Sequence, residues 1–290
     1  MEKLKQILNV LNHPKQKPPT ESEHRQTNED EFQFDGFTEN LVETKYVDLL
    51  SEDELRELNE LLRWNCFTVD SKGRRFGRRA WPGKREKPQS VPDPRIIKLD
   101  QLFHLRDKHV LEFGCFEGVH TVGLSMFAER VVAVDSRIEN VVKTIVRSAF
   151  FGCSPTVFKC DLEKSDEFAR LPQVDVLHHV GVLYHLVDPV SHLLDLGRVV
   201  RQGIMLDTHF ARPEKVHLTY VARGRTFKYR HSDEGGKSEV FSGMGSHAKW
   251  LTLDTILSLL SEAGFSAIDH VEEHEERNGP RVLLFARRPA

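Results

Sequence analysis

The most informative part of this sequence is Val110-Leu111-Glu112-Phe113-Gly114-Cys115-Phe116-Glu117-Gly118. It begins with the apolar residues of a buried strand, continues into a turn that contains two glycines, and leads into a helical pattern. Because Gly114 has no Cβ, it can adopt a positive φ and lets a ligand approach the backbone. The stretch therefore predicts a strand, a tight turn and a helix that together form one edge of a ligand site.

Strands and helices alternate around this stretch. The expected strands are His109–Phe113, Val131–Val134, Thr156–Cys160, Val174–Val180 and Ile204–Asp207, and the expected helices are Val119–Ala128, Ile138–Phe151 and Pro189–Val200. A further helix (Thr252–Ala263) and a strand pair (Ala267–Glu272 and Arg281–Ala286) follow. Such βαβ alternation predicts an α/β domain over residues 105–290, with a doubly wound, mostly parallel sheet covered by helices on both faces.

The chain before residue 105 has a different character. Residues 1–45 are predicted to form a mobile, polar and acidic tail, because residues 14–31 contain no hydrophobic side chain to offset the entropy of ordering. Residues 46–104 are predicted to form a helical and basic extension. Ser51-Glu52-Asp53-Glu54 has the pattern of a capping box at a helix start. Basic residues concentrate between 72 and 87, where Gly73 and Pro82 favour a loop.

The composition excludes several classes of protein. The chain has 290 residues, 29% of them charged, and a formal net charge of −3, which gives no global basicity to attract nucleic acid. No apolar run approaches the roughly 18 residues of a membrane helix, so no membrane partner is expected. The four cysteines form no CxxC pair, and the first residues lack the apolar core of a secretory signal. A cytoplasmic location is therefore expected.

Two acidic residues follow neighbouring strands and indicate the kind of cofactor. Asp135 ends the second strand, where a carboxylate can accept both hydroxyls of a ribose. Asp161 follows the third strand and can accept from an adenine amine, with Leu162 covering the ring. A dinucleotide is less suitable, because Phe116 stands where its fingerprint needs glycine and Glu117 would repel a pyrophosphate at the helix start. The pattern favours an S-adenosyl cofactor with a cationic amino-acid part.

Taken together, Glu112–Gly118, Asp135 and Asp161-Leu162 resemble the class I methyltransferases that depend on S-adenosyl-L-methionine (SAM). The resemblance extends over roughly Leu105 to Ala286. It implies a Rossmann-like methyltransferase fold, in which a seven-stranded sheet has an antiparallel last strand.

The same resemblance implies a set of cofactor contacts. Phe116 departs from the pattern, because many members have glycine there, and we expect it to narrow the pocket without abolishing cofactor binding. The expected SAM contacts are Glu112, Gly114 and Gly118 around the methionine part, Asp135 at the ribose and Asp161 with Leu162 at the adenine, completed by Phe116, Ser136, Gly181, Tyr184, Lys72, Trp81 and Arg281.

A second resemblance is more specific. Val180-Gly181-Val182-Leu183-Tyr184-His185-Leu186 is similar to the Gly-Val-Leu-Tyr-His signature of the tRNA wobble-uridine carboxymethyltransferases, which use carboxy-SAM. In that family a lysine, this tyrosine and a C-terminal arginine read the extra carboxylate, and Lys72, Tyr184 and Arg281 are the matching positions here. Several methyltransferases of unassigned substrate also carry Leu-Tyr-His at this point, so both donors stay open.

The candidate catalytic residues are Tyr184, His185 and His209, which are expected at the mouth of the pocket. Holding a nucleophile in line with a methyl carbon can supply about 7–11 kcal/mol, so positioning can account for most of the catalysis. A base is needed only where the acceptor carries a proton near neutral pH. His185 and His209 are the candidate bases, and for each the alternative is a hydrogen-bonded structural histidine.

No metal site is expected from the histidine spacing. His178-His179, His185 and His192 do not reproduce the spaced pairs of a zinc site. Adjacent residues on a strand, such as His178 and His179, point to opposite faces of the sheet.

Two classes of acceptor compete. A small molecule is slightly favoured by the low net charge and by residues 211–249, a long insertion that could cover it. A tRNA wobble nucleotide is favoured by Gly181–His185 and by the segments 72–87 and 223–231, where cations alternate with aromatic residues. A third interpretation is a non-catalytic interaction protein that binds an adenosyl cofactor. The sequence leaves the oligomeric state open.

Overall fold

The computed structural model describes residues 44–78 and 87–289. The chain divides into two units, Met1–Gly36 and Phe37–Ala290, and all described residues belong to the second. The predicted tail, up to residue 43, and the predicted cofactor contact Trp81 therefore lie outside the described residues.

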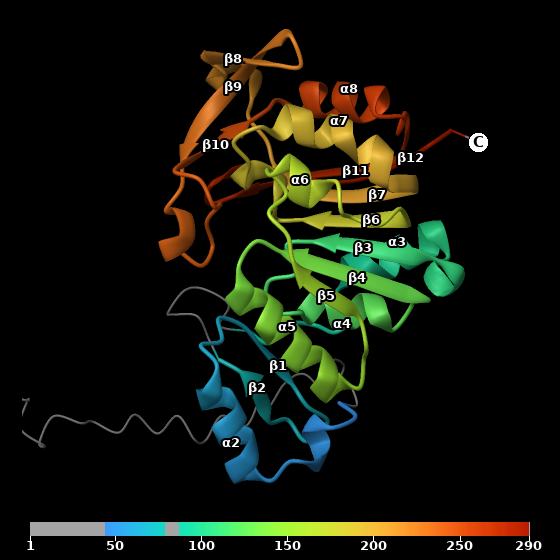
Figure 1. Cartoon of the computed structure of the whole chain (residues 1–290), viewed down its shortest axis with the longest axis vertical. Coiled ribbons are helices and arrows are strands. Elements are labelled where there is room, and N and C mark those ends of the chain that lie inside the picture. The colour runs from blue at the N-terminus through green and yellow to red at the C-terminus, as the bar shows by residue number, and fades with distance from the viewer. Residues whose placement is uncertain (1–43, 79–86, 290) are drawn as a thin grey trace, which may run out of the picture. The chain divides into compact units, whose positions relative to one another are not determined.

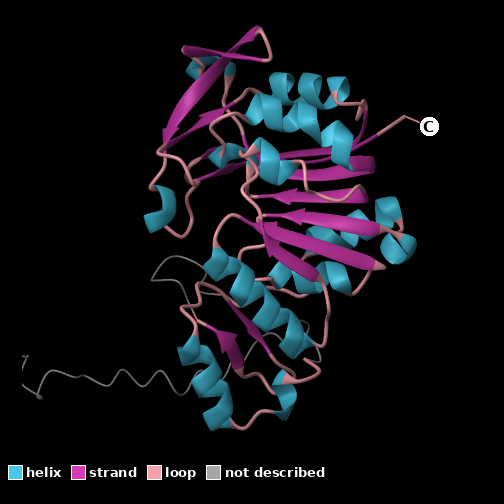
Figure 2. Cartoon of the chain, in the orientation of Figure 1, coloured by secondary structure: helices cyan, strands magenta, loops and turns pink. Residues whose placement is uncertain are grey.

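A seven-stranded sheet forms the centre of the second unit (Figures 1 and 2). Five strands are parallel: β3 (His109–Phe113), β4 (Arg130–Asp135), β5 (Thr156–Lys159), β6 (Val174–Val180) and β7 (Val200–His209). The last strand, β12 (Gly279–Arg287), runs antiparallel to β7 and to β11 (Ala267–Glu276). The predicted α/β class, the mostly parallel sheet and the antiparallel last strand are confirmed.

The strand order places a crevice at the middle of the sheet. The order is β11-β12-β7-β6-β3-β4-β5, so the chain runs outward from β3 to β5 and then returns to the other side of β3 with β6. The loops that leave β3 and β6 consequently diverge at the carboxyl ends of these strands. Ligands of open α/β sheets bind at such a switch point.

Helices cover both faces of the sheet. Alternate residues of one strand face opposite sides, so Val110 packs in the core beneath α3 and α4, whereas Leu111 packs in the core beneath α7 and α8. No helix among the described residues combines the length and apolar character needed to cross a bilayer. The helices are α3 (Pro94–Phe103), α4 (Val119–Ser125), α5 (Ile138–Phe151), α6 (Ser165–Phe168), α7 (Pro189–Val199) and α8 (Leu253–Glu262).

The extension that precedes α3 contains α2 (Glu52–Leu61) and the antiparallel pair β1 (Phe67–Val69) and β2 (Arg75–Gly77). The predicted capping box is confirmed, because Glu54 accepts from the Ser51 backbone N–H at 2.8 Å and the Glu54 N–H donates to Ser51 Oγ at 3.3 Å. The loop predicted over the basic cluster is wrong in one part, since it contains β2. Pairing with β1 holds those residues in an extended conformation.

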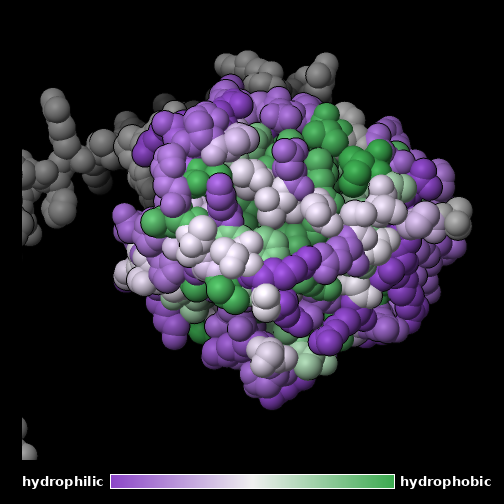
Figure 3. Space-filling view, turned by 90° about the horizontal axis from the view of Figure 1, so that it is seen from above, coloured by the Kyte–Doolittle hydropathy of each residue, from purple (hydrophilic) through white to green (hydrophobic). Residues whose placement is uncertain are grey.

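The insertion forms a separate three-stranded antiparallel sheet, with the order β10-β9-β8. Its strands are β8 (Leu218–Ala222), β9 (Arg225–Asp233) and β10 (His247–Trp250). Arg223 and Gly224 both adopt positive φ, as the central residues of a tight hairpin turn require. Figure 3 views the molecule from the side on which β8 and β9 lie and shows hydrophobic residues interspersed among hydrophilic ones.

Candidate active site

A cavity of about 330 Å³ lies at the carboxyl ends of β3, β4, β5 and β6. It coincides with the switch point of the sheet, and the insertion contributes one wall, from Val240 to Met244. The predicted site residues that line it are Glu112, Gly114, Phe116, Asp135, Ser136, Asp161, Leu162, Gly181, Tyr184, His185 and Arg281. The fold thus brings most of the predicted site residues together.

The glycine turn gives the cavity its floor. Gly114 has a φ of +66°, and a Cβ there would lie 2.5 Å from Cγ2 of Val182. Phe116 also has a positive φ, 51°, which explains why glycine is common at this position, and its ring packs 5.4 Å from that of Phe241 in the insertion. Gly118 does not line the cavity. It is the N-cap residue before α4, and a Cβ there would lie 2.9 Å from Thr144 Cα, so its role is helix packing.

Asp135 is fixed at the end of β4. Its Oδ2 accepts from the Phe116 N–H at 3.0 Å, and its Oδ1 accepts from the Arg137 N–H at 2.8 Å. Burial raises the pKa of the Asp135 carboxyl, and these hydrogen bonds oppose that rise. Each carboxylate oxygen can accept a further hydrogen bond, so the group remains suited to the two hydroxyls of a ribose.

Asp161 and Leu162 line the cavity just beyond β5. The Asp161 N–H donates to Oε2 of Glu167 at 2.7 Å, which holds this turn at the end of the strand. Glu163 then accepts from the N–H groups of Val187 and Asp188, at 2.6 and 3.1 Å. These bonds fix the loop after β5 against the loop after β6, and thereby close one side of the cavity.

Glu117 does not act as the sequence suggested. Its carboxylate is buried, lies 2.9 Å from Nζ of Lys143, and accepts from the backbone N–H groups of Asn65 and Cys66. Lys143 offsets its charge, so Glu117 gives no reason to prefer a cationic ligand. Its role is to attach the segment before β1 to the start of α4.

Glu112 lies on the cavity side of β3 and is almost fully buried. Burial, together with the negative charge of Asp135, raises the pKa of Glu112 to about 8. Its Oε2 accepts a hydrogen bond from Thr121 Oγ1 at 2.5 Å. The side chain therefore sits in a polar but poorly solvated corner of the site.

Asp207, near the end of β7, holds two arginines beside the cavity. Its Oδ1 lies 2.5 Å from Nε of Arg281, and its Oδ2 lies 2.5 Å from Nη1 of Arg95. Arg95 is also bound by Asp93 at 2.8 Å, and the Arg281 guanidinium lies 5.7 Å from the centre of the Tyr184 ring. Sequence reasoning missed Arg95 and Asp207, although Asp93-Pro94 is a recognisable helix start that places Arg95 in the first turn.

His185 is oriented by a residue of the insertion. Its Nδ1 lies 3.0 Å from Oε1 of Glu234, which follows β9. Oε2 of Glu234 accepts from Ser242 Oγ and from the Gly243 N–H. Burial raises the pKa of the Glu234 carboxyl, but these bonds outweigh it and hold the pKa below its usual value. Nothing in the sequence signalled Glu234, because it meets His185 only through the folding of the insertion.

His209 is placed differently from the prediction that it is a base at the mouth. It does not line the cavity, and its side chain is buried. Its Nδ1 lies 3.2 Å from the Pro280 carbonyl oxygen, and its ring stacks on Trp250 and meets the Tyr184 ring edge-on at 4.8 Å. Burial lowers its pKa. His209 therefore packs against the Tyr184 ring and holds it in place.

Lys72 does not reach the cavity. It lies in the turn between β1 and β2, and its Nζ donates to the Asp48 carbonyl at 2.7 Å. In this arrangement Lys72 is not placed to bind the extra carboxylate of a donor, as the sequence had suggested. The cations that line the cavity beside Arg281 are Arg95 and Arg137, and Arg95 shares the Asp207 carboxylate with Arg281.

No family model matches the chain. It is 30% identical to the tRNA U34 carboxymethyltransferase of Cellvibrio japonicus over 113 residues, which are 38% of this chain and 35% of that protein. It is also 30% identical to the tRNA U34 carboxymethyltransferase of Methylococcus capsulatus over 130 residues, 44% of this chain and 40% of that protein. The similarity thus covers well under half of the length of these relatives.

Among solved structures, the chain is similar to the N-terminal domain of EvdMO1 with SAH bound, with a TM-score of 0.69 and 22% identity, over 83% of this chain and 98% of that one. The same domain in the presence of SAH and D-fucose gives a TM-score of 0.67. The chain has the Rossmann-like fold of class I SAM-dependent methyltransferases.

Proposed function

We propose that this chain is a methyltransferase that uses SAM as donor and acts on an acceptor bound beneath the insertion. The observation that carries the proposal is the convergence of Asp135, Asp161 and the Tyr184-His185 pair on one cavity at the switch point of the sheet. The two carboxylates would hold the ribose and the adenine, and the aromatic pair would face the transferred group.

The residues present fit a SAM molecule. Asp135 has lone pairs left for two hydroxyls, and Glu112 lies beside the glycine turn, where the amino-acid part is expected. Bound SAM would supply an electrophilic methyl carbon. What the protein adds is position, because a cavity with a fixed floor and a covering insertion holds the acceptor at one angle.

His185 is suited to remove a proton from an acceptor. With Nδ1–H donating to Glu234, the neutral imidazole presents Nε2 as its basic atom. Glu234 holds the orientation of the ring. The base would act on a hydroxyl or similar acceptor group that carries its proton near neutral pH.

The packing of the insertion favours a small acceptor over a nucleic acid. The Arg230 guanidinium lies 4.5 Å from the Trp250 ring, and Lys249 Nζ lies 4.9 Å from the Tyr220 ring and donates to the Val187 carbonyl. These aromatic and basic groups therefore contact one another. A single-strand nucleic-acid surface would leave them open for bases and phosphates.

A second candidate function is tRNA carboxymethylation with carboxy-SAM. Tyr184 and Arg281 lie together at the cavity, and the curated relatives carry the name tRNA U34 carboxymethyltransferase. Arg95 could replace the missing lysine as the second cation. Asp207 and Asp93 already offset both arginines, however, which weakens the attraction for another carboxylate.

The experiment that separates these functions is label transfer. The full chain is incubated with SAM labelled in its methyl group, and separately with labelled carboxy-SAM, in the presence of bulk tRNA or of small hydroxylated compounds. Methyl label in a small compound supports the main proposal, whereas label in tRNA from carboxy-SAM alone replaces it with the second. Tight SAM binding without transfer to any acceptor would instead mean a non-catalytic binding protein.

A further inference from the structure

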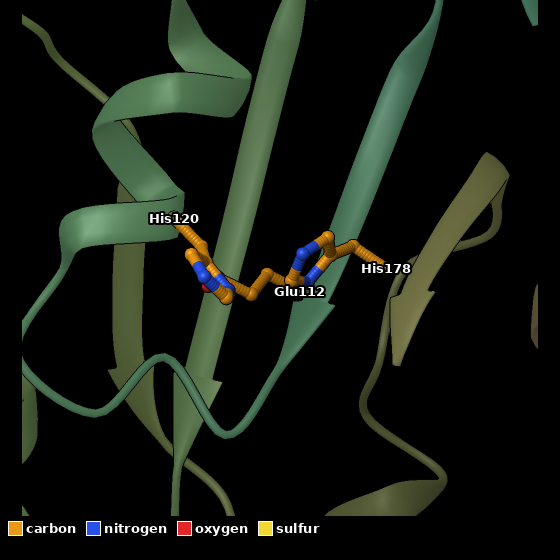
Figure 4. Close-up of side chains that lie close together, drawn as sticks. All are labelled: Glu112, His120 and His178. Atoms are coloured by element: carbon orange, nitrogen blue, oxygen red, sulfur yellow. The ribbon is translucent and has the colours of Figure 1, made fainter. Parts of the chain in front are cut away.

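Three potential metal ligands from different elements meet beside the cavity. Glu112 of β3 and His178 of β6 are register partners in the parallel pair, so their side chains share one face of the sheet. His120, in the first turn of α4, lies over the same face. The ligand atoms of the three residues all lie within 4.8 Å of one another, and Figure 4 shows the side chains pointing toward a common centre.

His178 is the unusual member of this group. Its side chain is only 1% exposed, and neither ring nitrogen has a hydrogen-bond partner among the residues that the structure describes. A buried polar group without a partner costs about 1–3 kcal/mol. Imidazole nitrogen is also the commonest protein ligand for transition metals, and a metal ion would give one of these nitrogens a partner.

The other two residues have the supporting contacts typical of metal ligands. Thr121 Oγ1 donates to Oε2 of Glu112, which fixes the carboxylate and leaves Oε1 for an ion. Nε2 of His120 lies 3.4 Å from Oδ2 of Asp93, a carboxylate placed to orient the ring. Carboxylates that orient a ligating histidine, and hydrogen bonds that orient a ligating carboxylate, recur around bound metals.

We propose that Glu112, His120 and His178 bind a divalent transition-metal ion whose remaining coordination positions face the cavity. Two histidines and one carboxylate form a donor set used for zinc and ferrous iron when positions are left open for substrate. Glu112 and His120 line the cavity, so those positions would meet a ligand bound there. The ion would hold an oxygen or nitrogen atom of that ligand.

Two features decide whether the geometry can accommodate an ion. Metal bonds of about 2.0–2.2 Å need ligand atoms closer together than 4.8 Å, so the three side chains must approach one another when an ion binds. Arg95 lies 3.2 Å from His120 Nε2, but Asp93 and Asp207 both pair with it and offset its charge. The proposal does not depend on methyl transfer, because it concerns binding of the ion itself.

The test is a titration of the chelator-treated full chain with Co²⁺, followed by visible absorption, because protein-bound Co²⁺ gives ligand-field bands that report its coordination. We expect one equivalent to bind with such bands. His120→Ala and His178→Gln should each weaken binding at least tenfold, since each removes a ligand. The exposed His274→Ala is the matched control and should leave binding unchanged.

His120→Ala provides the decisive variant even if His178→Gln fails to fold, because the side chain of His120 is partly exposed. Absence of stoichiometric Co²⁺ binding to the folded wild-type chain would overturn the proposal. Wild-type Co²⁺ bands in folded His120→Ala would do the same, and would assign any bound metal to another part of the surface.

Discussion

The two sides of the cavity are built in different ways. The side formed by the loops after β3, β4 and β5 consists of short, contiguous stretches, and its main acid, Asp135, is held by backbone N–H groups. The opposite side combines the loop after β6 with Arg95, Asp207, Glu234 and Arg281, which come from distant parts of the chain. We infer that the first side binds the donor, whereas the second side determines which acceptor binds.

Removing the candidate base should give the largest effect and should separate the two sides. His185→Ala should lower the rate of methyl transfer about 10²–10⁴-fold for an acceptor that must lose a proton. Affinity for SAM should change less than about twofold, because His185 belongs to the acceptor side. Single-turnover rates and calorimetric SAM titration on the same preparation measure both quantities, and an equal loss in the two would erase the distinction between the sides.

Breaking the buried ion pair beneath the donor side should cost the most stability. Lys143→Met leaves the Glu117 carboxylate buried without its cation, which should lower the free energy of unfolding by about 3–5 kcal/mol. The matched control is Lys98→Met, which removes the exposed pair with Glu272 and should cost less than about 1 kcal/mol. Urea denaturation of both variants checks this, and equal losses would contradict the anchoring role of Glu117.

A methyl group added to the glycine turn should weaken donor binding. Gly114→Ala places a Cβ against Val182 and imposes a positive φ on alanine, which should cost about 1–3 kcal/mol and weaken SAM binding. Gly224→Ala, in the hairpin turn of the insertion, also has a positive φ but has nothing within 4 Å of the added Cβ. The SAM affinity of Gly224→Ala should match that of the wild type. Calorimetric SAM titration of both variants shows whether the loss of affinity depends on the position of the added methyl group or on backbone strain alone.

The smallest expected effect is the pH dependence of the acceptor side. Because the pKa of Glu234 is lowered in the folded chain, its contribution to stability is present above the unfolded pKa and is lost as pH falls through the folded value. The free energy of unfolding of the wild type should exceed that of Glu234→Gln by about 1 kcal/mol near neutral pH. This difference should vanish in acid, where Glu234 is protonated. Melting temperatures of the two proteins across this range measure it; a constant difference would exclude a role for the charge.

The sequence predicted the elements around the glycine turn better than the elements that bring Arg95 and Asp207 to the cavity, and the reason is physical. β3 and α5 have the predicted bounds because strong periodicity and a C-terminal Gly152 mark them. β7 begins at Val200 rather than at Ile204, since α7 passes into it without a loop that would signal the change. Helix α3 was not predicted, although Asp93 caps it, Pro94 begins it and its buried residues Ile96, Leu99 and Phe103 have helical spacing.

The misplaced site residues share one cause. Lys72 and His209 were assigned from their neighbours in the sequence, but contacts with Asp48 in one case and with Trp250 and Pro280 in the other decide where they lie. Arg95 and Glu234 could not be found for the same reason. Each acquires its place only by pairing with a residue from another element, Asp207 or His185.

Calorimetric titration of the full chain with SAM, beside the Asp135→Ala variant, shows whether this cavity binds an S-adenosyl donor. We expect wild-type binding and a loss of about 100-fold in the variant, because two hydrogen bonds to a charged group disappear. Asp254→Ala, at an exposed position on α8, is the control and should bind as the wild type does. Equal SAM affinity in wild type and Asp135→Ala, or binding of NAD in place of SAM, would contradict the assignment of this side of the cavity to an S-adenosyl donor.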